Sequence, residues 1–168
     1  MNSKISIAVS VLSHTDRFEW LLEKATEFKV HQIFPIRFQK TKHVAFKMGS
    51  LNYILANASL KYKTQPPILH NVCSLENLFN LNSIPDKKFL AHYSEKQKDM
   101  LCRANEDCML IIGPEDGFTE DEIKFCIKNN CNIVTLGDIK LRTEAAGMAG
   151  MCILNGVWDT IPNSILSA

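Results

Sequence analysis

The sequence predicts one α/β domain built on a mostly parallel sheet with helices on both faces. Apolar, strand-like stretches alternate along the chain with stretches whose apolar residues recur at helical spacing, which is the pattern of βαβ units. The chain has 168 residues, the length of a single domain with a substantial core. Because no repeat, low-complexity tract or linker divides the sequence, residues 1–168 are predicted to form one domain.

Five apolar stretches are predicted to be strands, since each is short and bounded by turn residues or charged residues. They cover residues 5–12, 33–36, 89–92, 108–112 and 133–136. Ligands of parallel sheets bind outside the carboxyl ends of the strands. The residues that follow each stretch are therefore the first place to look for a site.

Helix starts are predicted from capping residues. Asp16 is expected to cap a helix, because the apolar residues after it recur with the i, i+3, i+4 spacing of one buried face. Ser74 is expected to cap a short helix, and Thr119 and Glu122 form the Thr-x-x-Glu pattern of a capping box. The expected helices lie at residues 18–28, 51–62, 75–79, 119–129 and about 142–158.

Composition sets limits on function. The formal net charge is +1, so an RNA or DNA contact would need a local basic patch. No signal peptide is evident, and no apolar run approaches the roughly 20 residues of a membrane helix. The six cysteines form no Cys-x-x-Cys pair, and the histidines complete no zinc pattern. The sequence therefore favours a cytoplasmic protein with reduced, structural thiols, no membrane association and no metal.

Two of the predicted strands end in glycine-containing loops. The stretch "LIIGPEDGFTEDEI" leaves its strand at Gly113, and "VTLGDIKLRTEAAGMAG" leaves its strand at Gly137. Taken alone, the first is an ordinary turn and the second a helix start with a capping threonine. Neither contains Gly-x-Gly-x-x-Gly or Gly-x-x-x-x-Gly-Lys-Ser/Thr, so dinucleotide and nucleoside-triphosphate binding are poorly supported.

Taken together and in this order, the two loops resemble the signature of the bacterial 16S ribosomal RNA uridine N-3 methyltransferases. These enzymes belong to the SPOUT superfamily of S-adenosylmethionine-dependent, trefoil-knotted methyltransferases. The segment "DRFEWLLEKATEFKVHQIFPI", residues 16–36, is similar to the first helix and second strand of that family. The resemblance runs from about residue 4 to residue 158. It implies a SPOUT-type sheet with a C-terminal trefoil knot at about residues 108–160.

The sequence departs from the family in four places. The family carries an N-terminal PUA-type RNA-binding domain, which is expected to be absent here because the chain begins where that domain would end. Asp116 stands where glycine is usual, Ala145 replaces a threonine, and Ala58 lies in an altered segment before a proline. Two alternatives therefore remain beside rRNA methylation: a SPOUT methyltransferase with another RNA target, and a degenerate protein that binds S-adenosylmethionine without catalysis.

The resemblance also implies a cofactor site. In this superfamily the adenosine of S-adenosylmethionine lies among backbone groups of the knotted loops, and glycine-rich strand ends leave such groups open. The residues expected to bind the cofactor are Ile112, Gly113, Pro114, Glu115, Gly117, Leu136, Gly137, Leu141, Arg142 and Thr143. Core packing is the alternative role for the three aliphatic residues.

Three residues are candidates for the chemistry. Uridine N-3 is a poor nucleophile while it is protonated, so methylation needs a base, a cation that stabilises the anion, or both. Arg142 is the one permanent cation in either loop and is expected to neutralise charge on the uracil oxygens. Glu144 and Glu115 are candidates to accept the proton or to position Arg142. The alternative for Arg142 is a structural salt bridge with Glu144.

The expected partners are 16S rRNA in the small ribosomal subunit and a second copy of the chain. Basic clusters are usually solvated faces, but phosphate contacts dominate RNA affinity. The candidates for RNA contact are Arg37, Lys40, Lys42, Lys61 and Lys63. SPOUT enzymes are typically homodimers that pack through the last helix, where this chain has a face of small residues. That face consists of Ala145, Ala146, Gly147, Ala149 and Gly150.

Overall fold

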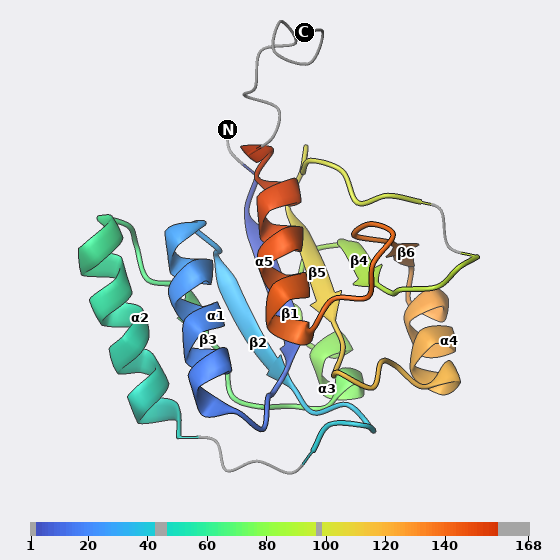
Figure 1. Ribbon diagram of the computed structural model, residues 1–168, viewed down its shortest axis with the longest axis horizontal. Helices are drawn as coiled ribbons and strands as arrows, with labels where there is room; N and C mark the ends of the chain where they lie inside the picture. The colour runs from blue at the N-terminus through green and yellow to red at the C-terminus, as the bar shows by residue number, and fades with distance from the viewer. Residues whose placement is uncertain (1–2, 43–46, 97–98, 158–168) are drawn as a thin grey trace, which may run out of the picture.

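The computed structural model describes residues 3–42, 47–96 and 99–157 (Figure 1). The strands are β1 (Ile5–Ser10), β2 (Gln32–Ile36), β3 (Ile68–Leu69), β4 (Lys87–Ala91), β5 (Cys108–Ile112) and β6 (Cys131–Val134). The helices are α1 (Thr15–Glu27), α2 (Met48–Tyr62), α3 (Leu75–Phe79), α4 (Glu120–Lys128) and α5 (Thr143–Leu154).

All six strands form one parallel sheet in the order β3-β2-β1-β5-β4-β6, which confirms the predicted α/β fold class. The two central strands, β1 and β5, are buried along their whole lengths. The first half of the chain extends the sheet from β1 towards β3, and the second half extends it from β5 towards β6. Because all strands are parallel, their carboxyl ends share one edge, which is the lower edge in Figure 1.

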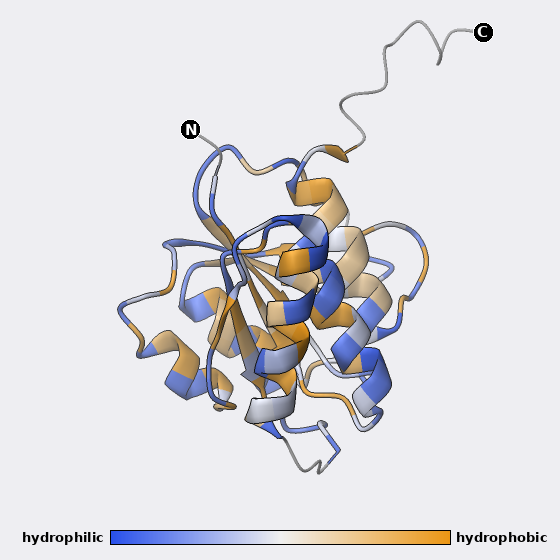
Figure 2. Ribbon diagram, turned by 90° about the vertical axis from the view of Figure 1, so that its left-hand side faces the viewer, coloured by the Kyte–Doolittle hydropathy of each residue, from blue (hydrophilic) through white to orange (hydrophobic). Residues whose placement is uncertain are grey.

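Two hydrophobic cores lie on opposite faces of the sheet. One core joins the sheet to α1, α2 and α5 through residues such as Leu21, Leu55 and Met151. The other joins it to α3 and α4 through residues such as Leu78 and Cys126. In Figure 2 the strands are mostly hydrophobic in colour and the surrounding helices carry the hydrophilic segments. Helices therefore cover both faces, as the sequence predicts.

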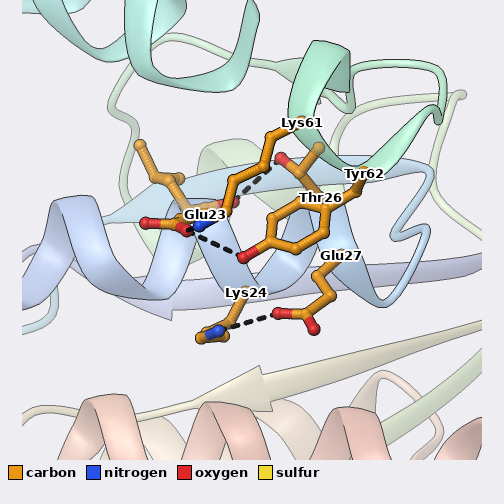
Figure 3. Close-up of polar contacts among 7 residues, drawn as sticks. Glu23, Lys24, Thr26, Glu27, Lys61 and Tyr62 are labelled. Carbon is orange, nitrogen blue, oxygen red and sulfur yellow. Dashed lines mark hydrogen bonds and ion pairs between the residues drawn. The ribbon is translucent and has the colours of Figure 1, made fainter. Parts of the chain in front are cut away.

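A polar cluster joins α1 to α2 on the surface (Figure 3). Lys61 Nζ and Tyr62 Oη each donate a hydrogen bond of 2.8 Å to Glu23 Oε1. The Lys61 ammonium also lies over the Tyr62 ring, 4.9 Å from its centroid. The hydrogen bonds from Lys61 and then Tyr62 lower the pKa of Glu23. The cluster thus holds the C-terminal ends of two neighbouring helices together.

Two of the three predicted caps are confirmed. Ser74 Oγ accepts the backbone N–H of Asn77, and Thr119 forms a full capping box with Glu122. The prediction for Asp16 is wrong, because α1 begins at Thr15 with His14 at the N-cap position and Asp16 lies in the first turn. A carboxylate in the first turn still interacts favourably with the positive end of the helix dipole.

Several element boundaries differ from the prediction. The two-residue strand β3 is not predicted, and it pairs with β2 just after the proline pair that ends the preceding segment. Strand β1 ends at Ser10 rather than at residue 12, and α2 begins three residues before the predicted start. The helix α5 ends at Leu154. Its predicted end at Trp158 lies outside the described residues.

The helix α5 packs closely on the sheet because it carries two buried glycines. A Cβ on Gly147 would lie 2.7 Å from Leu21 Cδ1, and a Cβ on Gly150 would collide with Leu110. These two members of the predicted small-residue face therefore contact the chain's own core. They are not available to a partner.

The segment before β5 contacts both β6 and the end of α5. The backbone N–H of Thr135 donates to Asp99 O, and the N–H of Ala104 donates to Leu154 O. The loop between β4 and β5 therefore reaches residues that come 36 to 50 positions later in the chain. This arrangement is compatible with the knot, which stays a prediction.

Candidate functional site

A cavity of about 240 Å³ opens at the carboxyl ends of β4, β5 and β6 and at the start of α5. Eight of the ten predicted cofactor residues line it: Ile112, Gly113, Pro114, Glu115, Gly117, Leu136, Leu141 and Thr143. The other two, Gly137 and Arg142, belong to the same loop as Leu141 but do not line the cavity. The structure therefore brings the two glycine-containing loops together around one space.

Nine further residues line the cavity that were not among the predicted cofactor residues. They are Ala91, His92, Tyr93, Asp116, Phe118, Thr135, Ile139, Lys140 and Ala146. The first three lie at the end of the predicted strand at residues 89–92 or directly after it. The rule that ligands lie beyond the carboxyl ends of parallel strands would have pointed to them. Tyr93 and Ile139 are exposed, so the cavity has an apolar rim beside the Lys140 ammonium.

A single hydrogen bond joins the two loops. Thr143 Oγ1 donates to the carbonyl oxygen of Gly113 over 2.9 Å, and the Thr143 side chain is buried. Thr143 is the first residue of α5 and its side chain caps nothing, so the capping role suggested by local sequence is wrong. Its hydroxyl instead fixes the strand end at Gly113 to the start of the last helix, across 30 positions of sequence.

Geometry explains why three positions in these loops are occupied by glycine. A Cβ at Gly113 would lie 2.9 Å from the Phe118 ring, which closes over that position. Gly117 and Gly137 have φ values of 72° and 138°, a region that other residues rarely adopt. A Cβ at Gly117 or at Gly137 would meet no atom within 4 Å, so no side chain covers the backbone on that side at these two positions.

The predicted catalytic residues are organised by an arginine that the sequence analysis missed. Arg17, in the first turn of α1, donates a 2.7 Å hydrogen bond to Glu115 Oε1. Its Nε lies 3.7 Å from Glu144 Oε1. Arg142 is exposed and forms no ion pair with any described residue, so the suggested Arg142–Glu144 salt bridge is wrong. One cation from α1 thus serves a cavity residue and a residue of α5.

Glu144 is incompletely satisfied in this arrangement. Its side chain is only 15% exposed, and its Oε2 atom is buried without a hydrogen-bond partner. A buried carboxylate oxygen without a donor is costly. Glu144 therefore retains the capacity to accept one more hydrogen bond, although neither Glu144 nor Arg142 lines the cavity itself.

His92 is the histidine of the cavity. It follows β4, and its ring centroid lies 6.3 Å from that of Phe118. Burial lowers the pKa of His92 below its ordinary value of 6.5, which favours the neutral ring. A neutral imidazole can both donate and accept a hydrogen bond inside the cavity.

The predicted RNA-contacting residues fall at two opposite ends of the sheet. Arg37, Lys40 and Lys42 follow β2 at the carboxyl edge, although His43, the last member of that basic cluster, lies outside the described residues. Lys40 Nζ donates to the carbonyl oxygens of Asp116 (3.1 Å) and Phe118 (3.4 Å). This basic segment is thus attached to the loop that lines the cavity.

The other two basic residues lie far from the cavity. Lys61 and Lys63 are at the C-terminal end of α2, beside the amino ends of the strands. Glu23 binds Lys61, and the hydrogen bond from Lys61 to that carboxylate raises the pKa of Lys61. The role of Lys61 and Lys63 in RNA binding stays a prediction. For Lys61, the contact that the structure shows is the hydrogen bond to Glu23, which joins α1 to α2.

The cysteines show neither pairing nor metal ligation. All six are free, and Cys108, Cys126 and Cys131 are buried. Burial, the largest cause, raises the pKa of Cys108 to about 11, so its thiol stays protonated at pH 7. Within residues 3–42, 47–96 and 99–157, no three His, Cys, Asp or Glu side chains are grouped as metal ligands. In the same ranges, no helix is long and apolar enough to cross a membrane.

The chain belongs to the RNA methyltransferase domain family, whose model matches residues 1–155. It is similar to the ribosomal RNA small subunit methyltransferase E of Rickettsia conorii, with 23% identity over 89% of this chain and 63% of the relative. The protein of the same name from Bacillus subtilis is 25% identical over 90% of this chain and 65% of the relative. The chain thus spans less than two thirds of the length of these curated relatives.

Solved structures share the fold over nearly the whole chain. A methyltransferase from Legionella pneumophila in complex with S-adenosylmethionine has a TM-score of 0.80 and 24% identity, over 93% of this chain and 67% of that one. The methyltransferase E of Neisseria gonorrhoeae, also bound to S-adenosylmethionine, gives the same values. A probable rRNA methyltransferase of Porphyromonas gingivalis has a TM-score of 0.81 and 22% identity, over 94% of this chain and 70% of that one. These likenesses show that the chain has the fold of these solved methyltransferases, with the parallel sheet and covering helices that the sequence predicts.

Proposed function

We propose that this chain is the catalytic domain of an S-adenosylmethionine-dependent RNA methyltransferase that acts on the N-3 atom of a uridine in small-subunit rRNA. The observation that carries the proposal is the joining of the two motif loops, by the Thr143–Gly113 hydrogen bond, around one cavity. Membership of the RNA methyltransferase domain family supports it. So do the names of the relatives from Rickettsia conorii and Bacillus subtilis.

The cavity fits the chemistry of S-adenosylmethionine. Its aliphatic wall, which includes Ile112, Leu136 and Leu141, suits the faces of an adenine ring. The carboxylates of Glu115 and Asp116 lie at the same cavity and suit ribose hydroxyls or the cationic groups of the ligand. The open backbone at Gly117 and Gly137 allows close approach of a ligand to amides and carbonyls. No phosphate-binding loop is present in these two segments, which argues against nucleotide cofactors.

The chain's own residues would orient the substrate and manage its proton. The bound cofactor supplies a methyl group on an activated sulfonium, so the protein has mainly to bind, orient and desolvate. Arg142 is exposed at the start of α5 and is proposed to reach the uracil oxygens from the solvent side. Glu144 or Glu115 would take the N-3 proton, and Arg17, hydrogen-bonded to Glu115 and 3.7 Å from Glu144, would position both carboxylates.

We also propose several features of the whole protein. They are a single domain over residues 1–168, a trefoil knot at about residues 108–160, cytoplasmic location, a homodimer and 16S rRNA as partner. Residues 158–160 of the knot region lie outside the described residues. A non-catalytic S-adenosylmethionine-binding protein is the alternative class, which Asp116 and Ala58 favour as departures from the family pattern.

Two experiments test the proposal. Calorimetry with S-adenosylmethionine, NAD and ATP should give binding heat for the first alone, and heat with NAD alone would reject it. Methyl transfer is then measured on small ribosomal subunits that lack the modification, with the product located by nuclease digestion and mass spectrometry. Tight cofactor binding without transfer would favour the non-catalytic alternative.

A further inference from the structure

A second hollow lies beside the cavity at the carboxyl edge of the sheet. It is lined by residues 11–13 after β1, by residues 40–42 after β2, and by residues 114–116 after β5. Residues 114–116 also line the cavity, so this short loop borders both spaces. The cavity occupies only one side of this loop, and the hollow lies on the other.

The hollow occupies the place where the connections of the sheet diverge. Strands β1 and β5 are neighbours. After β1 the chain enters α1 on one face, and after β5 it enters α4 on the opposite face. In open parallel sheets, ligands bind in the crevice formed where such connections separate. The cavity lies to one side of this crevice, at the ends of β5, β4 and β6, so the crevice itself has no assigned ligand.

The side chains around the hollow suit a nucleotide. The ammonium groups of Lys40 and Lys42 provide positive charge for phosphates, and Lys42 is exposed. The hydroxyl of Ser13 is exposed at the end of the β1 loop, where it can exchange hydrogen bonds with the polar edge of a base. Glu115 stands at the border with the cavity and is bound by Arg17.

The basic segment is held firmly in this position. Gln39 donates its backbone N–H to the buried carboxylate of Glu122 over 2.8 Å, and Thr41 Oγ1 is hydrogen-bonded to Ser10 Oγ over 2.9 Å. Together with the Lys40 contacts to Asp116 and Phe118, these bonds attach residues 39–41 to β1, to α4 and to the loop after β5. The hollow is therefore a preformed part of the carboxyl edge.

We propose that this hollow is the subsite for the methyl-accepting nucleotide, a pyrimidine unstacked from its RNA. The proposal rests on the proposed function. The hollow is small, about 20 Å³, so it receives one edge of the base while Lys40 and Lys42 neutralise the flanking phosphates. RNA bases are recognised in this unstacked form, and enzymes that modify bases extrude them. A base at this border lies beside Glu115 and next to the cofactor cavity.

The test combines photo-cross-linking with a bulky substitution. Small-subunit rRNA that contains 4-thiouridine is irradiated with the protein, and cross-linked peptides are identified by mass spectrometry. The expected cross-links map to residues 11–13, in the tryptic peptide 5–17, and to residues 40–42, in the tryptic peptides 38–40 and 41–42. Ser13→Trp fills the hollow and should lower both cross-linking and methyl transfer by about tenfold, the equivalent of about 1.4 kcal/mol of binding. Its affinity for S-adenosylmethionine should stay that of the unmodified protein.

Ser83→Trp is the matched control. Ser83 is also exposed, but it lies at the opposite edge of the sheet, where its carbonyl accepts Gln32 Nε2. This variant should cross-link and turn over like the unmodified protein.

The remaining outcomes of these experiments distinguish failure of the nucleotide subsite from failure of the proposed methyltransferase function. Cross-links confined to residues 92–93 or 61–63, or no cross-link at all, would overturn the subsite. Loss of cofactor binding in Ser13→Trp would also overturn it, since the hollow would then belong to the cofactor. Cross-links in the hollow without any methyl transfer would reject the proposed function and leave the nucleotide subsite standing.

Discussion

The hydroxyl of Thr143 carries an interaction that no other side chain of the two loops supplies among the described residues. Thr143→Val keeps the shape but leaves the Gly113 carbonyl without its donor. We expect a loss of about 1–2 kcal/mol in the free energy of unfolding, measured by urea denaturation. Affinity for S-adenosylmethionine, measured by calorimetry, should fall as well. Thr143→Ser retains the hydroxyl and should behave like the unmodified protein; a valine variant of full stability would contradict the prediction.

Arg142 should act on turnover rather than on cofactor binding. If its guanidinium meets the uracil oxygens only as charge develops, Arg142→Ala should cost roughly a hundredfold or more in kcat. Arg142→Lys should recover little, because a point charge does not reproduce a planar two-point contact. Single-turnover methyl transfer checks this, with calorimetry of the cofactor as the control. Full activity of the alanine variant would remove Arg142 from the mechanism.

At this scale the sequence predicted which loops form the site but not how their side chains pair. Ile112, Gly113 and Leu136 were named because the two glycine-containing loops resemble the motifs of a known family. Arg17 was missed because its partner Glu115 lies 98 positions away, and only the fold brings the two together. The same holds for Thr143, whose local surroundings indicate an ordinary helix cap.

The stabilisation that the Glu23 cluster provides between α1 and α2 should depend on pH. Hydrogen bonds from Lys61 and Tyr62 lower the pKa of Glu23 in the folded state. The stabilisation is therefore fully present above the ordinary pKa of 4.5 and is lost as the pH falls through the lower, folded value. Lys61→Met should lower the Tm above pH 4.5, and the difference from the unmodified protein should shrink in more acidic buffer. Lys63→Met is the control, and a difference independent of pH would contradict the assignment.

The helix α5 should tolerate no added methyl group at Gly150. Leu110, which a Cβ would meet, is fully buried between β1 and β4, so Gly150→Ala should destabilise the protein by about 1–3 kcal/mol. Gly49→Ala in α2 is the matched control, because a Cβ there meets no atom within 4 Å. That variant should be slightly more stable than the unmodified protein, because alanine has the higher helix propensity and meets no steric conflict there. Thermal unfolding of both variants checks the opposite signs.

Secondary structure was predictable where a long pattern specified it. Helices α1 and α4 show clear apolar spacing, and β5 is a compact apolar run with the predicted bounds. Strand β3 has only two residues, too few for any pattern, and it exists because the edge of β2 offers free backbone groups. The start of α1 was misplaced because aspartate is favoured both at the N-cap and in the first turn of a helix. The presence of Asp16 alone therefore does not distinguish the two positions.

The whole molecule is expected to be a symmetric homodimer. The outer face of α5 retains partly exposed small and apolar residues, among them Ala145, Met148 and Ala149, after Gly147 and Gly150 are assigned to the core. Light scattering at micromolar concentration should give twice the protomer mass of 19.0 kDa. Met148→Glu should weaken association. Ile127→Glu, on the exposed surface of α4, should not; a monomeric unmodified protein would contradict the prediction.

The late position of α5 in the chain has a consequence during synthesis. Its buried residues complete a core whose other half comes from Leu21 in α1 and from Leu110 and Ile112 in β5. Ribosomes add residues slowly enough that this apolar surface stays uncovered for a few seconds after β5 has emerged. In that interval the nascent polypeptide offers a broad hydrophobic face to chaperones and to neighbouring nascent chains. A slow step between the emergence of residue 112 and that of residue 143 from the ribosome would therefore prolong this exposure and promote aggregation.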